Sequence, residues 1–121
     1  MKVSLALILA SLVTAVAAPA FAGEQFGNIV YLNVRDSDGL LWVGLSGNPT
    51  GRPACAVGTK YWIIPNENSE TGQRLYAALL AANMAGRAIT ITGKNTCTRW
   101  GDGEDIDFIE VWGPAGPPPP Q

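Results

Sequence analysis

Histidine is absent from this 121-residue chain, and cysteine occurs only at Cys55 and Cys97. Without histidine the chain cannot form a Ser-His-Asp triad or an HExxH zinc motif, and no imidazole can activate a thiol. Most enzyme classes are therefore excluded. We expect a protein that is not an enzyme and that holds no metal ion or other cofactor.

Carboxylate pairs are the remaining route to catalysis, and the acidic residues Asp102, Glu104, Asp105 and Asp107 lie close together. On a strand, Glu104 and Asp105 point to opposite faces, whereas a retaining glycosidase needs two carboxyls about 5 Å apart across a cleft. We favour a solvated acidic strand end, with calcium binding and catalysis as the alternatives.

Positive charge is also scarce. The chain has 8 basic residues against 10 acidic ones and a formal net charge of −2. A nucleic-acid-binding domain normally carries a basic stripe or patch. We therefore expect no nucleic acid among the partners of this chain.

Long apolar runs occur only near the N-terminus. After Met1 and Lys2, residues 3–17 are almost wholly apolar, and Ala20-Phe21-Ala22 matches a small-x-small cleavage site. The alternative, a membrane anchor, requires roughly 20 apolar residues. We expect residues 1–22 to be a signal peptide cleaved after Ala22, no membrane span, and a secreted or periplasmic bacterial protein.

The rest of the chain is long enough for one small domain, which we place at residues 23–112. Residues 113–121 form a Pro-rich tail that we expect to be extended and solvated. A domain of this size is marginal by burial alone, and two cysteines in an exported chain usually pair. We therefore predict a Cys55 to Cys97 disulfide, worth roughly 3 to 4 kcal/mol for a loop of about 40 residues.

One helix is predicted over residues 70–85. Ser69 is a suitable N-cap and Gly86 a suitable C-terminal stop. Its apolar stripe consists of two rows, Leu75, Leu79 and Ala82 beside Tyr76, Leu80 and Met84. Such a broad stripe requires a sheet to pack against.

Strands are predicted over residues 28–35, 40–46, 54–64, 89–92 and 104–112 from alternating apolar positions. The first two form a hairpin around Asp36, Asp38 and Gly39, which resemble the start of an EF-hand but are better explained as a turn. In the last strand the alternation slips between Phe108 and Ile109, which predicts either a bulge or two covered faces.

The order of three strands, a helix and two strands is that of an OB-fold, an all-β five-stranded barrel with one helix at its end. The same elements could form an open sheet with the helix packed on it. We prefer the barrel because the strands are short, bent at glycines and apolar on one face.

Tryptophan is frequent for a chain of this length, with 4 residues. Trp62 is expected in the core or at a subunit contact, and Trp42 on the face of its strand opposite Leu41 and Val43. Trp100 lies in a loop with Arg99 and Asp102, and aromatic rings beside such residues are typical of sugar sites. There Trp100 would stack on the sugar, Arg99 would pair with an acidic sugar, and Asp102 would accept from hydroxyls. Alternatively, Trp100 covers the barrel end or a subunit seam.

Several segments of the chain together carry a resemblance to a known family, namely Arg52-Pro53-Ala54-Cys55-Ala56-Val57, Tyr61-Trp62, the helical residues 76–82, the Gly86 stop and Ile89-Thr90-Ile91. They resemble the receptor-binding B subunits of subtilase cytotoxin and its relatives among AB5 toxins. The resemblance implies an OB-fold, a ring of five subunits whose helices line a pore, and binding of host glycans that are often sialylated. The toxin subunits have an extra segment that contributes to the sugar pocket, so no individual glycan contact is transferred to this chain.

Two hypotheses for the function follow. The first is an exported glycan-binding protein of the B-subunit type that forms a ring, expected to be a homopentamer, with or without a catalytic A subunit. The second is a secreted or periplasmic OB-fold module that binds protein or stabilises an assembly and has no sugar site.

Overall fold

The structure is a computed structural model that describes residues 21–119. Its elements are β1 (Glu24–Val34), β2 (Leu41–Leu45), the 3-10 helix η1 (Ala54–Ala56), β3 (Tyr61–Ile63), α1 (Glu70–Met84), β4 (Ala88–Gly93) and β5 (Glu104–Val111). All of them lie within the predicted domain at 23–112. The predicted signal peptide at 1–22 lies outside the described residues except for its last two positions.

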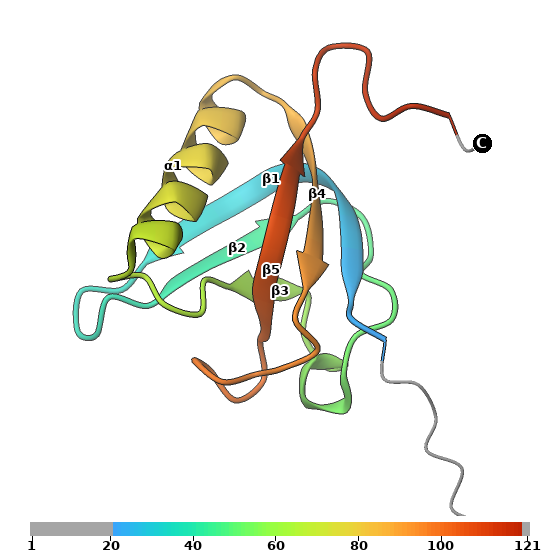
Figure 1. Ribbon diagram of the computed structural model, residues 1–121. Helices are drawn as coiled ribbons and strands as arrows, with labels where there is room; N and C mark the ends of the chain where they lie inside the picture. The colour runs from blue at the N-terminus through green and yellow to red at the C-terminus, as the bar shows by residue number, and fades with distance from the viewer. Residues whose placement is uncertain (1–20, 120–121) are drawn as a thin grey trace, which may run out of the picture.

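The strands form a closed barrel in the spatial order β1-β2-β3-β5-β4 (Figure 1). Along the chain, α1 lies between β3 and β4. The long strand β1 pairs with β4 through its first half and with β2 through its second half, with a register shift between Ile29 and Tyr31. The parallel pairing of β3 with β5 closes the barrel. The predicted all-β OB-fold-like barrel with one helix is therefore confirmed, and the open sheet is excluded.

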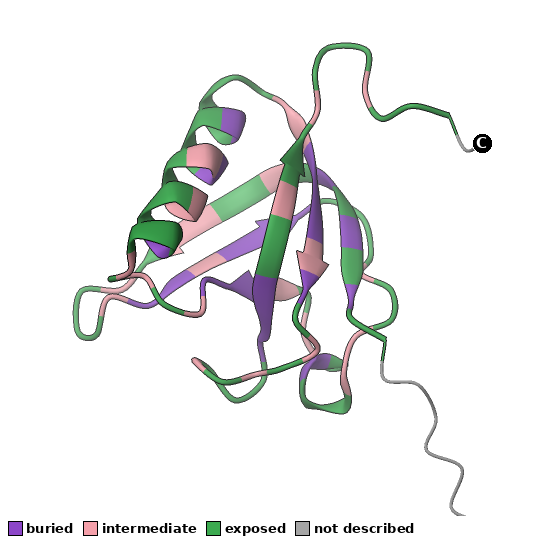
Figure 2. Cartoon of the chain, viewed as in Figure 1, coloured by how far each residue is buried: buried purple, intermediate pink, exposed green. Residues whose placement is uncertain are grey.

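The helix α1 buries one face against the barrel, as Figure 2 shows. Ser69 caps its N-terminus by accepting a hydrogen bond from the Gly72 amide at 2.9 Å. Leu79 and Ala82 belong to the core, whereas Leu80 and Met84 are 41% and 80% exposed. The predicted second apolar row is therefore only partly buried, and the stripe is narrower than expected.

The third predicted strand, residues 54–64, is wrong over its first half. Residues 54–56 form η1, and only Tyr61–Ile63 is a strand. The guanidinium of Arg52 accounts for the difference, because it donates to the backbone oxygens of Ala56 and Thr59, which point toward it. Carbonyls used in this way are not available for strand pairing.

The last strand differs from its predicted phase. Thr92 pairs with Phe108 but Gly93 pairs with Ile106, so Asp107 is an extra residue at this position. Ile106 is buried and Phe108 is 46% exposed. The irregularity thus lies between Ile106 and Phe108, one step before the predicted slip, and these two side chains do not share a face.

The predicted disulfide is confirmed. Cys55 in η1 and Cys97 in the β4–β5 loop are bonded, with their Cα atoms 6.4 Å apart and a separation of 42 positions in the sequence. The bond joins two irregular segments that the barrel hydrogen bonds do not connect. It therefore fixes one end of the β4–β5 loop.

Candidate functional site

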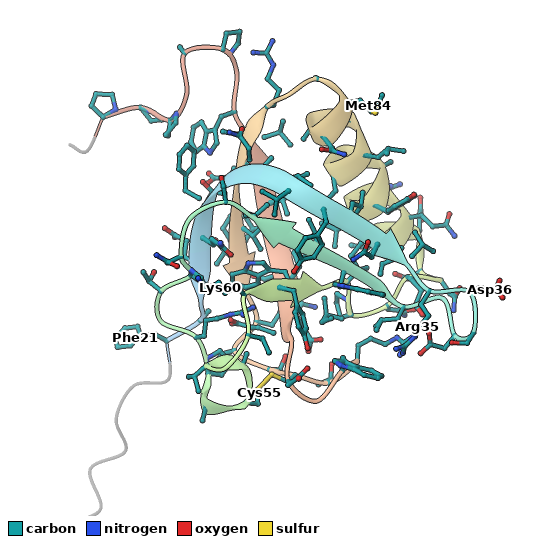
Figure 3. The ribbon with its side chains drawn as sticks, turned by 180° about the vertical axis from the view of Figure 1, so that it is seen from behind. Phe21, Arg35, Asp36, Cys55, Lys60 and Met84 are labelled. Carbon is teal, nitrogen blue, oxygen red and sulfur yellow. A yellow bond between two sulfur atoms is a disulfide. The ribbon has the colours of Figure 1, made fainter. Side chains whose placement is uncertain are left out.

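A cavity of about 220 Å³ lies on the outer face of β2 and β3, between the β1–β2 loop and the β4–β5 loop. It is lined by Arg35, Leu40, Trp42, Tyr61, Ile63 and Trp100. Figure 3 looks toward this side of the barrel and shows Arg35 at the end of the β1–β2 hairpin. We call this cavity the aromatic pocket.

The strand register places the aromatic side chains of the pocket. Trp42 pairs with Ile63, and Gly44 pairs with Tyr61, so Trp42 and Tyr61 come from neighbouring strands. The ring of Tyr31 occupies the space above Gly44, since a Cβ added at Gly44 would lie 2.3 Å from Tyr31 Cζ. Glycine at this position therefore lets Tyr31 extend the aromatic surface across β2.

Two loops meet at the rim of the aromatic pocket. The guanidinium carbon of Arg35 lies 4.5 Å from the centroid of the Trp100 ring, a cation–π contact. Arg35 also donates to both carboxylate oxygens of Asp38, at 2.8 and 2.6 Å. These hydrogen bonds hold the pKa of Asp38 well below its ordinary range. Arg35 is thus oriented by its own turn, and it orients Trp100 in the facing loop.

Tyr61 and Asp102 form a second polar contact of this region. The Tyr61 hydroxyl donates to Asp102 Oδ1, and the Asp102 carbonyl accepts from Thr59 Oγ1 at 2.6 Å. Burial, followed by the hydrogen bond to Asp102, raises the pKa of Tyr61 to about 12. At neutral pH the hydroxyl is therefore a donor, and the exposed Asp102 carboxylate has acceptor capacity left for a ligand.

The structure separates the three residues predicted for a sugar site. Trp100 lines the aromatic pocket, and Asp102 contacts it through Tyr61. The Arg99 guanidinium instead donates to Glu67 at 2.7 and 3.1 Å and to the Asp38 carbonyl at 3.0 Å. Arg99 is therefore occupied by an ion pair that joins the β4–β5 loop to the segment before α1.

Five lining residues were not predicted as members of this site, namely Arg35, Leu40, Trp42, Tyr61 and Ile63. The position of Trp42 on the outer face of its strand was the only signal available in the sequence. Arg35 is 65 positions from Trp100 in the sequence, and they come together only because the barrel places the β1–β2 and β4–β5 loops at the same end.

The prediction of a solvated acidic strand end is wrong for Glu104 and Asp105, which are both fully buried. Asp105 accepts hydrogen bonds from the hydroxyls of Thr96 and Thr98 at 2.8 and 2.7 Å. Glu104 accepts from backbone amides of other segments. These donors replace water, so both carboxylates can lie in the interior. Asp102 and Asp107 are exposed, as predicted.

Comparison of the chain with protein-family models, with curated proteins and with solved structures gives no match. Between residues 21 and 119, no cluster of three or more His, Cys, Asp or Glu side chains is placed to hold a metal ion. In the same range, no helix has the length and apolar character needed to cross a membrane.

Proposed function

We propose that this chain binds a carbohydrate in the aromatic pocket. The observation that carries the proposal is the convergence of Trp42, Tyr61 and Trp100 on one cavity beside the Arg35 guanidinium. Aromatic faces stack on the apolar C–H face of a sugar ring, while a few polar groups bind its hydroxyls. In OB-folds, the face of strands 2 and 3 with the loops beside it is the surface that binds oligosaccharides and oligonucleotides.

The volume of the cavity and the net charge of the chain restrict the class of ligand. The cavity of about 220 Å³ is smaller than the roughly 300 to 1,000 Å³ of sites for drug-sized ligands, which favours one sugar residue of a glycan. The net negative charge of the chain disfavours an oligonucleotide. Arg35 lines the pocket whereas Arg99 does not, so Arg35 takes the role that we predicted for Arg99. Its Nε and Nη2 donate to Asp38, and its Nη1 is the group that would donate to an acidic sugar.

The second part of the proposal is that the protein is exported. The Cys55 to Cys97 disulfide fits a protein of an oxidising compartment. With a signal peptide cleaved after Ala22, the chain is secreted or periplasmic. The exposed apolar residues Leu80 and Met84 on α1 support contacts between copies in a ring, as in the B subunits that the sequence resembles. Such a ring acts alone or carries an A subunit.

A glycan array probed with the processed protein tests the proposal, followed by calorimetric titration of the best ligand. Trp100→Ala is expected to weaken binding about 30-fold or more, the equivalent of about 2 kcal/mol at a binding hot spot. Because Trp100 is 39% exposed, the thermal midpoint is expected to change little.

Phe108→Ala is the matched control, since it removes an exposed aromatic ring on β5 that does not line the aromatic pocket. It is expected to leave affinity unchanged. Wild-type affinity in the Trp100 variant would place the sugar elsewhere. An array without any ligand would favour the second candidate, an OB-fold module that binds protein through exposed apolar residues such as Leu80 and Met84.

A further inference from the structure

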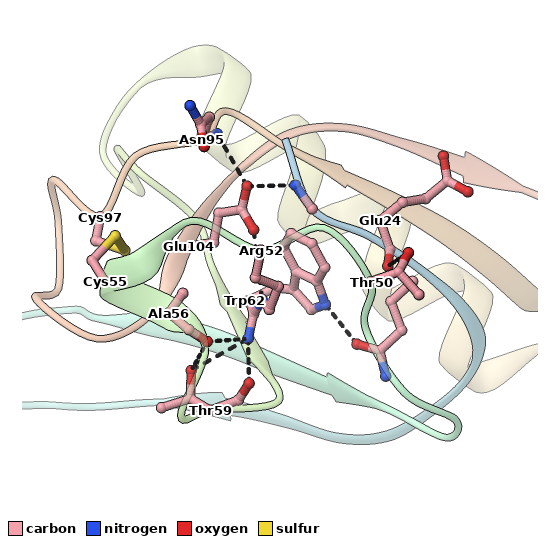
Figure 4. A network of polar contacts seen from close by, with 12 residues as sticks. Glu24, Thr50, Arg52, Cys55, Ala56, Thr59, Trp62, Asn95, Cys97 and Glu104 are labelled. Atoms are coloured by element: carbon pink, nitrogen blue, oxygen red, sulfur yellow. Dashed lines mark hydrogen bonds and ion pairs between the residues drawn. A yellow bond between two sulfur atoms is a disulfide. The ribbon is translucent and has the colours of Figure 1, made fainter. Parts of the chain in front are cut away.

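The carboxylate of Glu104, the first residue of β5, lies fully buried beside the start of β1. Its Oε1 accepts hydrogen bonds from the Gly23 amide at 2.9 Å and from the Asn95 amide at 3.0 Å. Its Oε2 lies 3.5 Å from Arg52 Nε, whose side chain is also buried. Figure 4 shows Glu104 between Asn95 and Arg52. Three distant segments therefore meet at one buried charge.

This buried network is incomplete on one side. Among the described residues, Glu104 Oε2 and Arg52 Nε are the two buried side-chain atoms that have no hydrogen-bond partner. Arg52 cannot easily move closer to Glu104, because it donates to the Thr59 carbonyl at 2.6 Å and stacks on the Trp62 ring at 4.3 Å. An unpartnered oxygen on a buried carboxylate is costly. A further donor at Oε2 would stabilise the fold.

Gly23 is enclosed by the same network. Its carbonyl accepts from the Gly93 amide at 2.8 Å, so its backbone is fixed one residue before β1 begins. A Cβ added at Gly23 would lie 2.3 Å from Glu104 Oε2 and 3.1 Å from both Arg52 Cγ and Trp62 Cη2. Ala22, in contrast, is exposed. The ordered barrel network thus starts at the residue that follows the expected cleavage site.

We infer that cleavage between Ala22 and Gly23 creates an α-ammonium group that pairs with the buried carboxylate of Glu104, so that removal of the leader completes the fold. In this hydrolysis, water adds across the peptide bond, the Ala22 carbonyl carbon gains the oxygen, and the nitrogen leaves as the new N-terminus of Gly23. An amide nitrogen donates one proton, whereas an ammonium donates three. The additional protons can satisfy Oε2 without moving Arg52.

The charges around Gly23 favour this pairing. Glu104 and its neighbour Asp105 are two fully buried carboxylates, and Arg52 is the buried guanidinium beside Glu104. The α-ammonium adds a second positive charge. The other charged groups on the adjoining elements are Glu24 in β1, Lys94 after β4, and Asp107 and Glu110 in β5, and all four are exposed to solvent. Solvent screens these charges more than it screens the buried ones.

Two chains of defined N-terminus test the inference, one beginning at Gly23 and a matched one beginning at Ala22. All described strands and α1 are retained in both. The pKa of the α-amino group is measured by NMR on ¹³C-labelled protein. We expect a value at least about one unit above the ordinary 7.7 to 8.0 for the Gly23 chain, and an ordinary value for the Ala22 chain.

Stability against pH provides the second readout. A group whose pKa is raised by folding contributes its full stabilisation of the fold at pH values below its unfolded pKa. This contribution is lost as the pH rises through its folded pKa. The denaturation midpoint of the Gly23 chain should therefore fall more steeply above about pH 8 than that of the Ala22 chain. Acetylation of the Gly23 amine, which leaves every side chain intact, should remove this difference.

Equal α-amino pKa values and equal pH profiles for the two chains would overturn the inference. So would a processed protein whose intact mass shows an N-terminus other than Gly23. Glu104→Gln in the Gly23 chain should return the α-amino pKa to its ordinary value. Where that variant does not fold, the pH profile of stability of the acetylated chain tests the same pairing. The inference depends on cleavage and not on sugar binding, so a negative glycan array does not affect it.

Discussion

The ion pair between Arg99 and Glu67 gives the clearest single-residue prediction. The hydrogen bonds from Arg99 lower the pKa of Glu67, whose side chain is largely buried. A carboxyl group whose pKa is lowered by folding stabilises the fold at pH values above its unfolded pKa of about 4.3. This contribution is lost as the pH falls through its folded pKa. Glu67→Gln should therefore cost on the order of 1 kcal/mol at pH 7 and flatten the loss of stability on acidification.

Urea denaturation of both proteins between pH 3 and 7 measures this effect. Glu70→Gln is the control, because Glu70 forms an exposed ion pair with Arg74 and should change stability little. The glycan affinity of the Glu67 variant should also stay near wild type, since Arg99 does not line the aromatic pocket. A wild-type acid profile in this variant would mean that the pair does not stabilise the fold.

For single residues, the sequence predicted which kinds of side chain lie together better than it predicted which side chains are buried. Trp100 was expected beside polar groups and is found there, and Trp62 was expected in the core as one of two options and is fully buried. Glu104 and Asp105 were expected in solvent, because a carboxylate normally remains there. Their burial depends on donors such as Gly23 and Thr98, which a local pattern cannot supply.

Among the secondary-structure elements, α1 was predicted most accurately because its signals are local. Its cap, its end and its periodicity all lie within the helix or next to it, and its observed bounds, Glu70–Met84, differ from the predicted range by one residue. The segment at 54–60 was missed because a side-chain contact and a disulfide determine its conformation. The Arg52 guanidinium donates to a backbone carbonyl of this segment, and Cys97 bonds to Cys55. Neither interaction can be recognised from the alternation of apolar residues in the sequence.

The attachment of α1 to the barrel can be tested at Leu79, which is fully buried in the core cluster. Leu79→Ala should destabilise the protein by about 2 to 5 kcal/mol, because it removes apolar contacts and leaves a cavity. Asn83→Ala, one turn further along and exposed, should change stability by less than about 0.5 kcal/mol. Equal denaturation midpoints for the two variants would contradict the observed orientation of α1.

For the molecule as a whole, the order of elements left a barrel or an open sheet, and the short strands with their glycine bends favoured the barrel. Three strands, one helix and two strands have few compact arrangements, and the observed order β1-β2-β3-β5-β4 is one of them. The aromatic pocket could not be predicted in the same way. It exists because closure of the barrel brings the loops carrying Arg35 and Trp100 to one end of β2 and β3.

The disulfide is expected to affect the stability of the whole domain. It joins residues 42 positions apart, so its removal frees a long loop in the unfolded chain. Cys55→Ser with Cys97→Ser should lower the free energy of unfolding by roughly 3 to 4 kcal/mol. Chemical denaturation of the double variant measures the loss, with reduced wild-type protein as the control. A change below about 1 kcal/mol would show that the barrel holds the two segments without the bond.

Assembly into a ring is the largest-scale prediction, and the structure changes the reasons for it. The sequence left Trp62 as a possible subunit contact, but the barrel is closed and Trp62 is fully buried. The remaining support is the outer face of α1, where Leu80 and Met84 are exposed. We therefore expect light scattering of the processed protein at micromolar concentration to give the mass of several chains.

Met84→Glu should reduce that mass toward a single chain without a change in thermal midpoint, because an exposed methionine contributes little to the core. Val57→Glu is the control, since Val57 is equally exposed but lies next to η1. A monomeric wild-type protein would count against the ring. In a ring, several aromatic pockets engage one glycan-coated surface, so the Met84 variant should keep its affinity for a single soluble glycan and lose the 10²- to 10⁴-fold gain that multivalent attachment provides.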